Sequence, residues 1–159
     1  MPVFDYGDIL YMHASQSILK SLDVVYHSVL RFIIGCDFQT HHCDLYRAVG
    51  WTSLATRREE HCLIFIFKAL SGKLPLYLSS LLNIKDPVHR TRSAFYITLQ
   101  APARPANFIL GDSAFQRYAP DKWNKLQATL KLDSVTSIGQ PEFKCLLKKS
   151  LREICTCFA

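Results

Sequence analysis

Hydrophobic positions recur at helical spacing between Ser17 and Ile34. Apolar residues three or four positions apart predict a buried stripe, and polar residues between them mark the opposite face. The stripe comprises Ile18, Leu22, Val25, Val29 and Ile33, and the polar face Lys20, Asp23, His27 and Arg31. Ser15 or Ser17 can cap the start of this helix, and Gly35 can end it in the left-handed conformation.

Three further helices are expected in the first half of the chain. One ends at Gly50, one runs from Thr52 or Ser53 to a stop at Gly72, and a short one covers residues 76–82. Within the second, the apolar run 63–67 has a composition that also suits a buried strand. The length of the segment and its flanking charges favour helix.

The character of the chain changes at residue 83. Alternating apolar residues over 95–100 predict a strand, residues 107–110 a return strand, and two basic helices follow, the last with Pro141 in its first turn. The last helix is expected to bury Phe143, Leu146, Leu147, Leu151 and Ile154.

The predicted fold class is mainly α, a helical bundle-like fragment with a small β-hairpin insertion around 94–110. We expect a single domain over 1–159, with a helical part (1–82) and a part with the strand pair and basic helices (83–159).

Composition and charge indicate a globular chain with a basic later part. Of its 159 residues 49% are hydrophobic and 20% charged, unlike a disordered chain. Residues 1–50 carry three Lys and Arg against five Asp and Glu, a net charge of −2, so the rest of the +6 chain carries +8. This asymmetry predicts an anionic partner for the later part: phosphate, an anionic membrane surface or an acidic protein. The alternative is a basic surface that serves solubility alone.

Neither a secretory signal nor a membrane span is recognised. The N-terminus lacks a basic region followed by an apolar stretch, and no apolar run approaches the roughly 20 residues of a spanning helix. We therefore expect a soluble intracellular protein without a membrane partner, in nucleus or cytoplasm. Its six cysteines are expected to be reduced.

The chain lacks a complete catalytic set. Two-metal nucleotidyl chemistry needs converging carboxylates. Asp5 and Asp8 resemble a Tyr-x-Asp-Asp turn only superficially, because they are not adjacent, and a helix start or turn suits them better. Nucleophile elbows, catalytic-cysteine signatures and phosphate-cradling glycine loops are missing. The sequence predicts no enzyme on its own and no cofactor.

A metal site is a weaker hypothesis. Cys36, His41, His42 and Cys43 are ligand types that zinc prefers, but their spacing does not match a standard finger. In the alternative interpretation His41 and His42 cap or bridge backbone groups, and Cys43 and Cys62 pack as small apolar side chains.

Binding of nucleic acid is the remaining prediction. Basic residues alternate with aromatic ones, and together they can neutralise phosphates and stack unpaired bases. The aromatic residues also suit a core. The candidate phosphate contacts are Arg57, Arg58, Lys68, Lys73, Arg90, Arg92, Arg117, Lys122 and Lys125.

A series of short motifs carries a family resemblance along nearly the whole chain. It comprises Pro2-Val3-Phe4-Asp5-Tyr6-Gly7-Asp8, Leu30-Arg31-Phe32-Ile33 with Gly35, Thr40-His41-His42-Cys43, Val49-Gly50-Trp51, Ser53-Leu54, Arg57-Arg58, Lys68-Ala69-Leu70, Gly72-Lys73-Leu74-Pro75, Tyr77-Leu78-Ser79-Ser80-Leu81-Leu82, Arg90-Thr91-Arg92-Ser93, Ser113-Ala114-Phe115, Tyr118-Ala119-Pro120 and Trp123-Asn124. In this order they resemble the C-terminal stretch of the open reading frame of non-LTR (LINE-type, Jockey-like) retrotransposons, of the kind abundant in fish genomes.

The resemblance implies a parent with an endonuclease, a fingers-and-palm reverse transcriptase, and a helical thumb and tail. This chain resembles the last part, so the metal-holding aspartates of the palm have no counterpart in it. It departs from the family at Asp112, where a basic residue is usual, and at Pro141-Glu142. The implied function is a non-catalytic polymerase remnant that binds RNA or an RNA/DNA duplex, with the remainder of a polymerase as a partner. The alternative is a helical protein-interaction module without nucleic-acid affinity, and self-association is compatible with both.

Overall fold

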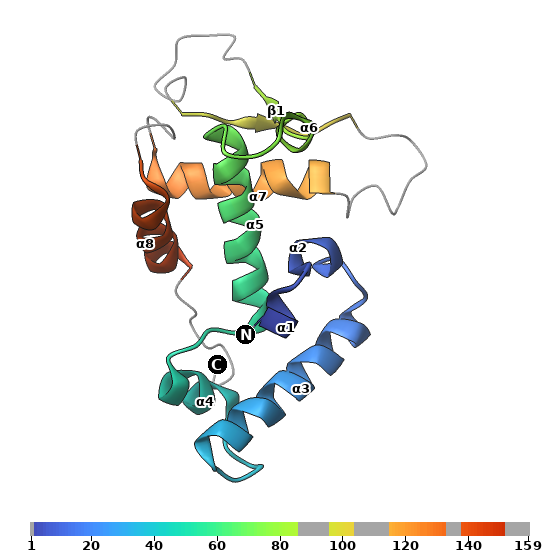
Figure 1. The fold of residues 1–159 in the computed structure, drawn as a ribbon, viewed down its shortest axis with the longest axis vertical. Helices are drawn as coiled ribbons and strands as arrows, with labels where there is room; N and C mark the ends of the chain where they lie inside the picture. The colour runs from blue at the N-terminus through green and yellow to red at the C-terminus, as the bar shows by residue number, and fades with distance from the viewer. Residues whose placement is uncertain (1, 86–95, 104–114, 133–137, 152–159) are drawn as a thin grey trace. The chain divides into compact units, whose positions relative to one another are not determined.

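The computed structural model describes residues 2–85, 96–103, 115–132 and 138–151 (Figure 1). They fall into two compact units, the first with described residues 2–61 and the second with those between 62 and 151. The boundary lies inside helix α5 (Leu54–Leu70), whereas the sequence placed its change of character at residue 83. Along the described parts of the chain, none of the helices is both long and apolar enough to cross a membrane.

The first unit is helical. It contains α1 (Pro2–Asp5), α2 (Asp8–Tyr11), α3 (Gln16–Ile34), α4 (His42–Val49) and the first half of α5. Gly35 and Gly50 end α3 and α4 with φ of 70°, the left-handed conformation that glycine adopts without strain. The predicted helix ends at these glycines, and the predicted start of α5 after Thr52 or Ser53, are confirmed.

The buried face of α3 differs from the predicted one. Ile18, Val25 and Ile33 are 52–56% exposed, whereas Leu19, Tyr26 and Leu30 are buried. The core of the unit joins Tyr26 and Leu30 to residues of α4 and α5. The prediction was wrong for Ile18, Val25 and Ile33, because apolar residues occur on several sides of α3 and helical spacing therefore fits two faces. Leu22 of the predicted stripe does pack against this core, whereas Ile18, Val25 and Ile33 remain more than half exposed.

The second unit combines helices with one small sheet. After the second half of α5 come α6 (Leu76–Ser79), β1 (Asn83–Ile84), β2 (Leu99–Gln100), α7 (Phe115–Leu130) and α8 (Gln140–Ser150). β1 and β2 are antiparallel, with Ile84 opposite Leu99. The mainly α class with a small strand pair is confirmed, and residues 63–67 are helical as predicted. The predicted return strand at 107–110 lies outside the described residues. Among the described residues, β2 pairs with the preceding β1.

Aromatic side chains form the centre of the second unit. The rings of Phe67 in α5 and Phe143 in α8 are stacked with centroids 4.2 Å apart, and Trp123 in α7 lies 6.1 Å from Phe143. All three are fully buried. Trp123 Nε1 donates a hydrogen bond to the carbonyl oxygen of Ile97, and the side-chain amide of Asn124 bonds both backbone groups of Leu99, with all three distances at 2.8–2.9 Å. These bonds attach the strand pair to α7 (Figure 1).

Candidate nucleic-acid interface

Positive charge is concentrated in the second unit. Residues 62–151 contain 13 Lys and Arg against 5 Asp and Glu, a net charge of +8. Residues 1–61 and 152–159 contain 6 against 8, a net charge of −2. The boundary between the two compact units therefore also separates the part of the chain with net negative charge from the part with net positive charge. We expect any phosphate-binding surface on the second unit, because its positive charge attracts phosphate.

One face of α7 combines basic and aromatic side chains. Tyr118, Lys122 and Lys125 follow one another at spacings of four and three, which places them on one side of the helix. The Lys122 ammonium lies 5.4 Å from the centroid of the Tyr118 ring. Lys125 pairs with Asp121 at 2.8 Å, but both side chains are more than half exposed, at 72% and 57%. An exposed pair of this kind contributes little, so Lys125 can exchange its carboxylate for a phosphate.

The remaining described candidates of the second unit lie outside this face. Lys73 is exposed after the end of α5, with its ammonium 5.9 Å from the centroid of the Phe67 ring. Lys68 is half-buried in α5, and Arg117 of α7 donates to the carbonyl oxygen of Pro102 at 3.3 Å. Arg90 and Arg92 lie outside the described residues. Lys144, Lys148 and Lys149 are exposed on α8.

Arg57 and Arg58 have structural surroundings in the first unit. Arg57 binds Asp5 with two hydrogen bonds, Nε to Oδ1 at 3.0 Å and Nη2 to Oδ2 at 2.6 Å. Arg58 is only 6% exposed. Both guanidinium groups are therefore poorly placed for phosphate, and neither belongs to the candidate interface.

The Asp5–Arg57 pair also has an electrostatic signature. Burial alone would raise the pKa of Asp5, but the hydrogen bonds and positive charge of Arg57 lower it below its ordinary value. Burial opposes the charge of Arg57 in the same way, and the hydrogen bonds to Asp5 nevertheless raise its pKa. The charged form of each group is favoured by the other, which is typical of a pair that stabilises the folded unit.

Asp5→Asn is expected to lower the free energy of unfolding by about 1 to 3 kcal/mol at neutral pH, because a partly buried Arg57 loses its counter-charge. With the lower pKa in the folded chain, this stabilisation is fully present above the unfolded value of about 3.9 and is lost as the pH falls through the folded value. Urea unfolding at pH 7 and at pH 3 measures both effects.

The control is Asp44→Asn, which removes the exposed Arg47–Asp44 pair at 3.1 Å. We expect a change below about 0.5 kcal/mol there. Equal losses in the two variants would show that the Asp5 pair has no special structural role.

The two aspartates proposed for a turn contact basic side chains. Asp8 is buried and pairs with His61 Nδ1. The ligand atoms of Asp5, Asp8 and His61 lie within 4.8 Å of one another, but Arg57 adds a positive charge to the group. Two-metal catalysis uses several converging carboxylates without a competing cation. This cluster therefore resembles two ion pairs between helices more closely than it resembles a nucleotidyl transfer site.

Of the four metal-ligand candidates, three come together. His41, His42 and Cys43 at the start of α4 present ligand atoms within 4.8 Å of one another. Cys36 instead packs against the apolar core of the first unit. The sequence did not indicate that His27 lies beside this group. In the structure its ring stacks on that of His42, with centroids 5.5 Å apart. The two are 15 positions apart and meet only because α3 packs against α4. None of the four described cysteines forms a disulfide.

Comparison of the chain with family models, curated proteins and solved structures gives no match. The family resemblance therefore remains a prediction from the sequence motifs. Any functional assignment depends on the chain's own residues and their geometry.

Proposed function

We propose that this chain is a non-catalytic remnant of a retrotransposon RNA-directed DNA polymerase, and that its second unit binds RNA or a primer-template duplex by neutralising phosphates. The observation that carries the proposal is the separation of charge, +8 in the second unit against −2 in the first. Phosphate contacts supply most of the affinity of sequence-independent nucleic-acid binding. A surface with this function needs basic groups and does not need a catalytic constellation.

The arrangement on α7 supports binding to unpaired bases as well as to phosphates. Tyr118 is partly exposed beside Lys122, so that an aromatic face and two ammonium groups share one side of the helix. Stacking of a base on an aromatic ring contributes about 1 to 3 kcal/mol and depends little on sequence. We therefore expect general affinity with a preference for single-stranded segments.

Filter binding of a labelled single-stranded RNA by the full chain, across a salt series, tests the proposal. Contacts through Lys68, Lys73, Arg117, Lys122 and Lys125 predict that the logarithm of the binding constant falls with that of the salt concentration with a slope of about −3 to −4, at about 0.7 per contact. Binding that is absent at low salt, or that does not change with salt, would contradict the proposal.

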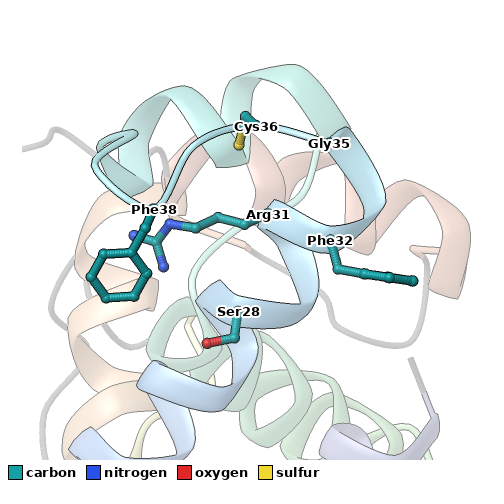
Figure 2. Close-up of a pocket in the computed structure, with 6 residues that line it drawn as sticks. All are labelled: Ser28, Arg31, Phe32, Gly35, Cys36 and Phe38. Carbon is teal, nitrogen blue, oxygen red and sulfur yellow. The ribbon is translucent and has the colours of Figure 1, made fainter.

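A helical protein-interaction module is the second candidate, and the exposed side of α3 favours it. Phe32 is 88% exposed, and Val24, Val25 and Ile33 are more than half exposed on the same helix. An open hollow of about 520 Å³ lies at its C-terminal end, lined by Ser28, Arg31, Phe32, Gly35, Cys36 and Phe38. In Figure 2 the Arg31 side chain extends toward Phe38, with its guanidinium carbon 5.0 Å from the ring centroid, while Phe32 points away. Exposed apolar surface of this kind is typical of contacts with another protein.

The two candidates make different predictions for the salt series. A protein-interaction module has no reason to bind RNA at any salt concentration, and its contacts would be on the first unit. Absence of RNA binding would therefore favour this second function.

A further inference from the structure

His41, His42 and Cys43 are placed together by the local conformation at the start of α4. His41 is the N-cap, with φ of −66° and ψ of 143°, and the next two residues occupy the first turn of the helix. This change from extended to helical backbone turns three consecutive side chains toward one region. Their ligand atoms lie within 4.8 Å of one another.

The distances suit closure around a single ion. Zinc bonds of about 2.0 Å to nitrogen and 2.3 Å to sulfur, at tetrahedral angles, hold ligand atoms about 3.3 to 3.8 Å apart. Because no separation exceeds 4.8 Å, closing the site needs shifts of about 1.5 Å or less, which side-chain rotation can supply without a change of backbone. Two imidazoles and one thiolate are a ligand set that zinc and similar borderline transition metals prefer over magnesium or calcium.

Neighbouring groups hold two of the three side chains in position. The backbone N–H of Cys43 donates to His41 Nδ1 at 3.4 Å, so this lone pair points into the first turn, where Cys43 lies. This bond is long, and replacing it with a metal contact therefore removes little. The His42 ring is stacked on His27 of α3 at an interplanar angle of 19°, and it also contacts the ring of Tyr46.

The helix start also suits the charge of a bound thiolate. The unpaired backbone N–H groups of a helix N-terminus favour negative charge in the first turn. Cys43 lies there, next to Asp44, which is another acidic group in the same first turn. The ligand types, the distances between the ligand atoms and the position at the helix start thus all suit a bound metal ion. None of these observations involves residues of the second unit.

We propose that His41, His42 and Cys43 bind one zinc-like transition-metal ion per chain, with water in the fourth position. This site is independent of the proposed RNA binding, since its residues belong to the other unit. It does not follow a standard finger, because all three ligands come from one short segment and one helix start.

The test is titration of the untagged, metal-free full chain with Zn²⁺ by calorimetry, and with Co²⁺ by optical absorption. We expect one site per chain, and with Co²⁺ a thiolate charge-transfer band together with visible bands of a four-coordinate ion. No saturable binding at tens of micromolar metal, or Co²⁺ absorption without a thiolate band, would overturn the proposal.

Variants identify the ligands. Cys43→Ser and His42→Gln are each expected to weaken Zn²⁺ binding by at least about 100-fold, since loss of an outer-shell partner already costs 10- to 100-fold. Cys145→Ser is the matched control, because Cys145 is exposed on α8 and outside the cluster. Circular dichroism of the metal-free variants establishes that each is folded. Zn²⁺ affinity of folded Cys43→Ser equal to that of the native chain would refute the assignment, as would equal losses in Cys43→Ser and Cys145→Ser.

Discussion

Trp123→Ala is expected to lower the free energy of unfolding of the second unit by about 3 to 5 kcal/mol, the range for removal of a large aromatic side chain from a core. Trp123 is fully buried and lies beside Phe143. Its indole N–H is also the donor that fixes the carbonyl of Ile97 at 2.8 Å. The substitution therefore leaves a cavity between α7 and α8 and removes one attachment of the strand pair. Urea unfolding followed by far-ultraviolet circular dichroism measures the loss.

Two control variants separate these contributions. Trp123→Phe keeps an aromatic ring but removes the donor and part of the volume, so we expect about 1 to 3 kcal/mol. Tyr77→Ala removes an aromatic residue that is 71% exposed, and a change within about 0.5 kcal/mol is expected. If Trp123→Ala changed stability no more than Tyr77→Ala, the described aromatic core would be incorrect.

Lys122→Gln combined with Lys125→Gln is expected to weaken binding to single-stranded RNA by about 25-fold at 0.1 M salt. Each lost phosphate contact removes about 0.7 from the salt slope, so the slope becomes shallower by about 1.4, and at 0.1 M this corresponds to 10 to the power 1.4. Filter binding across the same salt series measures both the loss of affinity at 0.1 M salt and the change in the salt slope.

A charge-matched control distinguishes a local contact from a general effect of net charge. Lys20→Gln combined with Arg47→Gln also removes two positive charges, from exposed positions of the first unit. We expect its RNA affinity to change less than about 3-fold, because neither residue belongs to the candidate interface and the charges of exposed groups are largely screened at 0.1 M salt. Similar losses in both double variants would mean that no particular surface binds the RNA.

Helix boundaries could be read from the sequence because local chemistry determines them. Gly35 and Gly50 terminate helices through their own left-handed conformations, and Pro141 lies in the first turn of α8. The buried face of α3 could not be read in the same way. Both Ile18 and Leu19 begin apolar series along the helix, and only packing against α4 and α5 selects the series of Leu19.

The strand pair shows a similar limit. The alternation that predicts β2 says nothing about its partner, which is β1 at Asn83–Ile84. Two-residue strands carry too few side chains for a periodic signal. Asn124 and Trp123 of α7 hold β2 and the residues before it through hydrogen bonds between residues about 25 positions apart, which the local sequence does not indicate.

The types of residue at the candidate sites could be predicted from the sequence, but the surroundings of these residues could not. Sequence alone groups Arg57 and Arg58 with the other basic residues. It does not show that Arg57 pairs with Asp5 of α1, more than 50 positions away, or that Arg58 is buried. The separation of charge between the earlier and later parts of the chain could be predicted from the sequence, because the net charge of the first 50 residues follows from their composition alone. The contact of His27 with His42 was not visible, as it needs two helices to pack.

Lysine footprinting of the full chain, with and without bound RNA, tests whether the second unit binds the RNA. The chain is acetylated under limiting conditions, and modification at each lysine is measured by mass spectrometry. We expect RNA to protect Lys73, Lys122 and Lys125 of the second unit and to leave Lys20 of the first unit unchanged. Equal modification of the three with and without RNA, or protection confined to Lys20, would contradict it.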